Sequence, residues 1–153
     1  MLEGWLESHR ATMAAKCTGL DDTRLREATV PPSSLSLMGL VRHMAEVERH
    51  WFRRCLAGED APPLYYTDED PDGEFRLSEE DTWKDACAAW QGEIERARVT
   101  AAGRSLEDFA ASKHRDGSSI NLRWIYTHMI EEYARHNGHA DLVRERVDGS
   151  TGV

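Results

Sequence analysis

The apolar stripe of one long helical segment, residues 125–147, is interrupted by three ionisable side chains. Alternating steps of four and three residues follow one face of an α-helix. Here these steps pass through Ile125, Met129, Glu132, His136, His139 and Val143. Burying a carboxylate or an imidazole costs free energy unless the group is paired, hydrogen-bonded or bound to a metal. We therefore expect a functional site on the core-facing side of this helix.

The length and the charge of the chain limit its class. With 153 residues it can bury one core without disulfides or structural metals, so we expect a single domain over residues 1–153. The 28 acidic residues outnumber the 19 basic ones, and the net charge of −9 disfavours binding to nucleic acid and to anionic lipid. We expect neither as a partner.

The sequence carries no signal for export or membrane insertion. No apolar run approaches the roughly 18 residues of a membrane span, and residues 1–16 are amphipathic, unlike a signal peptide. The cysteines Cys17, Cys55 and Cys87 are widely spaced, in helix-like contexts and without a CxxC pair. That usage is typical of buried thiols in a reducing compartment. We expect a cytoplasmic protein.

Hydrophobic periodicity predicts four helices, of which the first two lie in residues 1–57. The first ends at Thr18–Gly19, and its inner face carries Leu2, Trp5, Leu6, His9 and Met13. The second begins between Ser34 and Ser36 and ends at Ala57, before Gly58. Its inner face carries Leu37, Leu40, Val41, Met44, Val47, Trp51 and Cys55.

The other two helices follow long connections. Ser78 and Asp81 resemble a capping box that opens the third helix, which ends at Gly103. Its inner face carries Trp83, Ala86, Cys87, Trp90, Ile94 and Ala97. The fourth runs from about Ile120 to Val147. The connections are residues 20–34, 59–77 and 104–119, and the second is long enough to cross over along a bundle. No strand-like alternation stands out, so we predict an all-α four-helix bundle with long crossover connections.

The spacing of the polar residues favours a metal site. Glu132 and His136 are four residues apart, so both can bind one ion from the same helix face. His43, at the border of the second helix's apolar face, is the best third ligand. Three protein ligands leave a position for water or substrate, as in catalytic zinc sites. Mixed nitrogen and oxygen donors suit zinc first, and also nickel or ferrous iron.

Each of these residues also fits an ordinary role on its own. His43 and His136 fit hydrogen-bonded interior histidines, and Glu132 fits a carboxylate paired with Arg135. It is their coincidence on facing stripes that favours a metal.

The sequence also contains five other histidines and five tryptophans. His128, four residues before Glu132, is a neighbour of the ligands or an alternate ligand. His139 orients a ligand, binds substrate or supplies a proton, and it equally fits a satisfied core histidine. His50 and Glu46 read as part of a solvated or ion-paired face, and His9 and His114 as structural or surface residues. The five tryptophans read as core: Trp5, Trp51, Trp83, Trp90 and Trp124.

Two stretches carry a resemblance to a known superfamily. They are residues 31–51, PPSSLSLMGLVRHMAEVERHW, and residues 122–145, LRWIYTHMIEEYARHNGHADLVRE. The chain resembles the DinB/YfiT-like superfamily of metal-binding four-helix bundles, in particular its actinobacterial branch related to mycothiol-dependent maleylpyruvate isomerase. The matching ligand positions are His43, Glu132 and His136. Many members have histidine where this chain has Glu132, and a carboxylate there is similar to the pattern of the isomerase.

The resemblance implies an activity. It implies a thiol S-transferase or isomerase in which a divalent metal activates a low-molecular-weight thiol, such as mycothiol, for reaction with an electrophilic substrate. It also implies that two copies of the chain can form a homodimer. A non-catalytic metal- or ligand-binding stress protein and a metal-dependent hydrolase remain as alternatives. No residue reads as a mycothiol-recognition motif. Binding of thiol and electrophile without consumption of the thiol would favour the non-catalytic alternative.

Overall fold

The fold is built from helices, with one small hairpin. A computed structural model describes residues 1–152. Its elements are α1 (Leu2–Cys17), α2 (Asp22–Arg26), α3 (Leu37–Glu48), a π-helical continuation η1 (Arg49–Leu56), a 3₁₀ turn η2 (Gly73–Phe75), α4 (Trp83–Ala101), β1 (Phe109–Lys113), β2 (Ser119–Asn121) and α5 (Leu122–Asp148). The predicted all-α class is confirmed.

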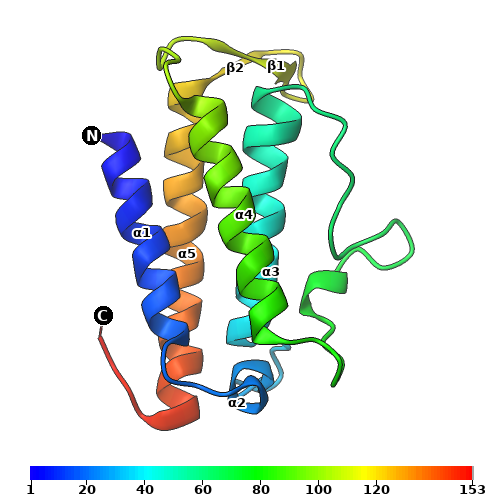
Figure 1. The fold of residues 1–153 in the computed structure, drawn as a ribbon, viewed down its shortest axis with the longest axis vertical. Helices are drawn as coiled ribbons and strands as arrows, with labels where there is room; N and C mark the ends of the chain where they lie inside the picture. The colour runs from blue at the N-terminus through cyan, green and yellow to red at the C-terminus, as the bar shows by residue number, and fades with distance from the viewer. Residues whose placement is uncertain (153) are drawn as a thin grey trace.

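Four long helical segments lie side by side, as Figure 1 shows: α1, α3 continued by η1, α4 and α5. Helix α1 packs mainly on α5, and α3 packs on both α4 and α5. Residues 57–82 run from the end of η1 along the length of the molecule to the start of α4, so that α3 and α4 point in the same direction (Figure 1). This is the crossover that the sequence predicts.

Side-chain caps fix where the long helices begin. The side chains of Ser36, Thr82 and Asn121 accept hydrogen bonds from backbone N–H groups in the first turns of α3, α4 and α5. The prediction that Ser78 and Asp81 open the third helix was wrong. Those two residues close a turn, with the backbone N–H of Ser78 donating to Asp81 at 2.7 Å, and the helix begins only at Trp83.

The connection between α4 and α5 contains an antiparallel hairpin that the sequence analysis missed. Strand β1 pairs with β2 with an irregular register, Phe109 opposite Asn121 and Lys113 opposite Ser119. The pairing is short and its strands are largely exposed, so no alternation of apolar and polar residues marks it in the sequence. It lies across the ends of the long helices (Figure 1).

The core differs from the predicted faces where charged residues occupy interior positions. Trp5 is 59% exposed, whereas Arg10 of the same helix is buried. In the second long helix Ala45, Glu48 and Phe52 are buried, while Val47 and Trp51 are only half-buried. Of the five tryptophans, Trp90 is fully buried and Trp51 and Trp83 pack against the core. Trp5 and Trp124 are exposed, so the prediction of core positions was wrong for these two.

A buried hydrogen-bond network connects all four long helices. Glu48 of α3 accepts from Arg10 of α1 at 2.8 and 2.6 Å and from the hydroxyl of Tyr133 of α5 at 2.7 Å. The indole N–H of Trp90 of α4 donates to the same hydroxyl at 2.8 Å. Burial raises the pKa of Tyr133 well above its ordinary value, so the hydroxyl keeps its proton. The network fixes how the helices sit against one another.

None of the helices in residues 1–152 combines the length and the apolar character that a bilayer span requires.

Candidate metal centre

The structure brings His43, Glu132 and His136 together. One donor atom from each of these side chains lies within 4.8 Å of the other two. His43 comes from α3, and the other two come from successive turns of α5. The imidazole rings of His43 and His136 have their centroids 4.6 Å apart, and Nε2 of His136 is 3.5 Å from Oε2 of Glu132. We call this cluster the His–Glu–His trio.

Burial keeps His136 neutral. The side chain is 11% exposed, and its burial, with the nearby His43, His139 and Arg135, lowers the pKa of His136 to about 3. A neutral imidazole has a lone pair on one ring nitrogen, which is the form that binds a metal. Near neutral pH, His136 is therefore ready to act as a ligand without first losing a proton.

Glu74 supports His43 from the crossover connection, and the sequence analysis missed it. Nδ1 of His43 lies 3.2 Å from Oε1 of Glu74, a buried carboxylate in η2. An imidazole that donates Nδ1–H to a carboxylate presents Nε2 as its lone-pair nitrogen, as metal-binding histidines commonly do. Phe75 stacks on the other side of the ring, 5.3 Å between centroids. These two contacts hold His43 in place.

The two flanking histidines lie where the sequence places them. Nδ1 of His139 is 3.3 Å from Nδ1 of His136, so His139 can accept the proton of that nitrogen and leave Nε2 of His136 facing Glu132. Nε2 of His128 is 3.7 Å from Oε1 of Glu132. Neither histidine belongs to the trio. Arg135 also contacts Glu132, at 3.2 Å, as the non-metal interpretation of that carboxylate expected.

The residues present fit a divalent cation. In a tetrahedral zinc site with bonds of about 2.0–2.2 Å, donor atoms lie roughly 3.3–3.6 Å apart. The Glu132–His136 pair already has this separation, and the 4.8 Å limit for the whole trio requires only small side-chain shifts. Oε2 of Glu74 is buried without a hydrogen-bond partner within residues 1–152. A cation bound nearby would give this unpaired oxygen a favourable electrostatic partner.

The contact between Glu74 and His43 gives a first prediction. We expect Glu74→Gln to weaken zinc binding by about 10–100-fold, because the amide keeps the shape of the side chain but lacks the charge that strengthens His43 as a donor. A competition titration against a chromogenic chelator measures this. Glu79→Gln, an exposed position of the same connection, is the matched control. Equal zinc affinities for the two variants would rule out a role for Glu74.

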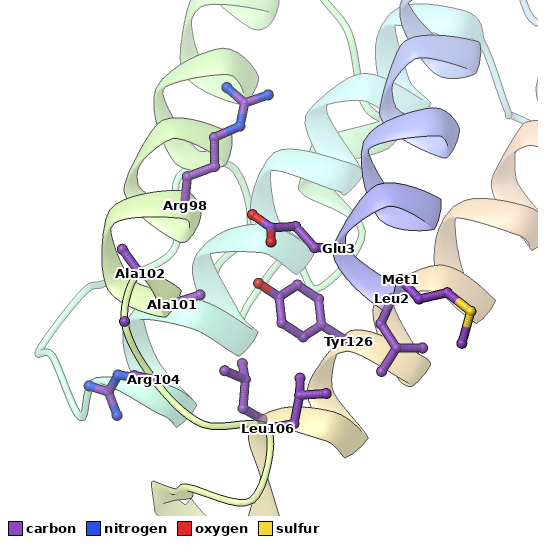
Figure 2. A pocket seen from close by; sticks show the side chains of 11 residues that line it. Met1, Leu2, Glu3, Arg98, Ala101, Ala102, Arg104, Leu106 and Tyr126 are labelled. Carbon is purple, nitrogen blue, oxygen red and sulfur yellow. The ribbon is translucent and has the colours of Figure 1, made fainter.

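A small cavity opens beside the trio. It has a volume of about 160 Å³ and is lined by His43, Glu46, Val47, His50, Trp51, Tyr66 and Glu74. A larger cavity, of about 310 Å³, lies between the ends of α1, α4 and α5, where Tyr126 projects between Leu106 and Glu3 (Figure 2). No residue that lines the larger cavity is a histidine or a cysteine, and none belongs to the trio. Of these two cavities, only the smaller one adjoins the trio, through His43.

On the face that carries Glu46 and His50, His50 is exposed as expected, but Glu46 is not. Glu46 is buried and accepts hydrogen bonds from the backbone N–H groups of Leu64 and Tyr65, so it anchors the crossover connection. The ion-paired part of the interpretation agrees with the structure, since Arg49 pairs with Glu93 at 2.5 Å. His50 contacts the thiol of Cys55 at 3.4 Å, and burial lowers the pKa of that imidazole and raises that of the thiol. This pair is therefore uncharged and not activated.

The comparison with protein families gives one match. A family described as mycothiol-S-transferase (MST) matches residues 1–149. The matched range includes the trio and the three residues that flank it, Glu74, His128 and His139. No curated protein shows significant similarity to the chain.

Proposed function

Since the chain belongs to the mycothiol-S-transferase family, we propose that it is a divalent-metal-dependent enzyme that transfers a low-molecular-weight thiol to an electrophilic substrate. The thiol is mycothiol or a close relative. His43, Glu132 and His136 hold the metal, zinc first and nickel or ferrous iron as alternatives. The observation that carries the proposal is the convergence of these three donors from two helices within 4.8 Å.

The donor set leaves room for a thiol. The three side chains would hold a divalent cation with fewer protein ligands than a closed structural site has, and the cation would supply the positive charge that favours the thiolate form of a thiol near neutral pH. The two imidazoles are neutral donors, so Glu132 is the single anionic ligand of the trio. A net positive centre remains to attract the thiolate. Glu74 and His139 orient the two imidazoles through the contacts described above.

The proton of the thiol needs an acceptor. We assign this role to His128, which lies 3.7 Å from Glu132 and is 23% exposed, so it can pass the proton on to solvent. His139 has a different role, because its Nδ1 is already engaged by His136. Both side chains thus assist the site without binding the metal.

We also propose that the protein works in the cytoplasm. Its three cysteines are free in the structure, which fits a reducing compartment where low-molecular-weight thiols are kept reduced. Its partners are then two small molecules, the thiol and the electrophile.

An assay of thiol consumption tests the function. Protein loaded with zinc, nickel or ferrous iron is mixed with mycothiol and an electrophile, and the loss of free thiol is followed with time. We expect consumption that depends on the metal and stops after a chelator is added. Binding of both compounds without thiol loss would instead assign a non-catalytic binding role, and cleavage of the electrophile by water alone would assign a hydrolase.

A further inference from the structure

Three aromatic side chains form a continuous surface beside the trio, and we call it the aromatic wall. It consists of Trp51, from η1, and of Trp124 and His128, from α5. The rings of Trp124 and His128 stack at 4.9 Å with an interplanar angle of 18°. Trp51 contacts both, with centroids 4.9 and 4.8 Å away. The three rings therefore hold one another in place.

The aromatic wall lies at the margin of the core, which Trp51 contacts. Trp124 is 36% exposed, the His128 side chain is 23% exposed, and Trp51 is half-buried. Large aromatic side chains left at the surface in one cluster are typical of ligand-binding surfaces. The wall is also continuous with the trio, because Nε2 of His128 lies 3.7 Å from Oε1 of Glu132.

Trp51 connects the aromatic wall with the small cavity beside the trio. Trp51 lines the cavity of about 160 Å³ that also contains His43. An apolar cavity of about 150 Å³ is sufficient for one benzene ring. The space beside the trio is therefore large enough for a single ring.

We propose that the aromatic wall binds the electrophilic co-substrate, and that this co-substrate carries a planar conjugated ring, as in an aryl halide. The inference rests on the thiol transfer proposed above. The thiolate sulfur forms a bond to the ring carbon, and the carbon–halogen bond breaks. The halide leaves with the electron pair of that bond, and the thiol proton is released to solvent. The wall holds the ring by stacking close to the thiolate.

Two electrophiles distinguish the wall from the rest of the site. Chlorodinitrobenzene is a planar aromatic halide, and iodoacetamide is an aliphatic one. For Trp124→Leu and Trp51→Leu in the metal-loaded protein, we expect KM for chlorodinitrobenzene to rise by about threefold to tenfold, the range that one aromatic contact gives. Because both tryptophans pack on His128, any loss of kcat should be equal for the two electrophiles, whereas KM for iodoacetamide and the metal content should stay at the wild-type level. Trp5→Leu removes an exposed tryptophan of α1 and is the matched control.

A binding measurement keeps the wall testable even without turnover. Dinitroaniline has a similar ring but no leaving group, and its equilibrium binding can be measured by calorimetry. Weaker binding to both wall variants, with wild-type binding to Trp5→Leu, supports the wall. Equal binding to all four proteins overturns it, and so does equal loss in Trp5→Leu. Absence of thiol consumption with either electrophile would count against the proposed function instead, so the two failures are separable.

Discussion

Replacing His136 by alanine is expected to lower the metal content from about one ion per chain to near zero, and thiol transfer to the uncatalysed rate. His136 supplies one of three donors, and it is the donor that links Glu132 to His43 across two helices. A two-donor site that remains would bind a divalent ion far more weakly. Elemental analysis after dialysis gives the metal content, and circular dichroism checks that the helices are retained.

A second histidine outside the trio serves as the control for this variant. His114 is half-buried and packs against Trp124 at 4.5 Å, but it contributes no donor to the trio. His114→Ala should keep the full metal content. Wild-type metal content in His136→Ala would contradict the site. Loss of metal together with helix content would show only that the variant fails to fold, and His136→Gln, which preserves more of the side-chain volume, then separates the two effects.

The free energy of unfolding of the metal-free protein should depend on pH through the same residue, His136. The pKa of His136 falls from 6.5 to about 3 on folding, because the buried imidazole disfavours charge. Between these two values the unfolded chain binds more protons than the folded one, so the free energy of unfolding decreases as the pH falls from about 6.5 towards about 3. Urea titrations across this range should show the decrease in metal-free wild type and a smaller one in His136→Ala.

The trio could be predicted from the sequence because most of its information is local. Glu132 and His136 share a helix face by their spacing alone, and polar residues on an apolar stripe are conspicuous. Only the prediction for His43 required a tertiary contact, namely that the second long helix packs against α5. In an all-α fold of four long helices, the second helix has few other possible neighbours. Local spacing and class were therefore sufficient for the three donors.

The residues that hold the trio and its surroundings in place could not be predicted in the same way. Glu74 lies 31 residues from His43, in a connection whose path no periodicity describes. Glu46 anchors that connection through backbone N–H groups, and such contacts leave no pattern in the side chains. The aromatic wall was hidden for another reason. Tryptophans near an apolar stripe predict core, and only the structure shows that Trp51 and Trp124 remain at the surface.

The interior charges were misplaced because periodicity assigns charged residues to the surface. Glu48 and Arg10 occupy core positions of α3 and α1 and satisfy one another across 38 residues of sequence. When these positions are taken as exposed, the predicted inner face of each helix is shifted around the helix axis. The prediction then places Trp5 and Trp51 in the core. A buried pair can be recognised only when both partners are placed together, and that placement depends on the packing of the helices.

Removing the charge at the centre of this network should cost the protein much of its stability. We expect Glu48→Ala to lower the free energy of unfolding by about 3–5 kcal/mol, because the buried Arg10 guanidinium loses its buried carboxylate partner and keeps only the partly exposed Glu7. It also removes the acceptor of the Tyr133 hydroxyl. Urea unfolding measures the change. Glu95→Ala breaks an exposed pair with Arg98 and, as the control, should cost less than about 1 kcal/mol.

A double variant tests whether the cost comes from the unpaired charge. Glu48→Leu combined with Arg10→Met removes both charges and fills the space with apolar atoms, so it should recover most of the stability lost in Glu48→Ala. A Glu48→Ala variant that loses less than about 1 kcal/mol would mean that water reaches Arg10 and replaces the carboxylate.

The same network is expected to influence the metal site. Because Tyr133 is adjacent to Glu132 on α5, the network also sets the position of α5 along its axis relative to α3. The stable double variant, with its polar contact to Tyr133 removed, should therefore bind zinc less tightly than wild type in the chelator competition, and equal affinity would show that apolar packing alone aligns the trio.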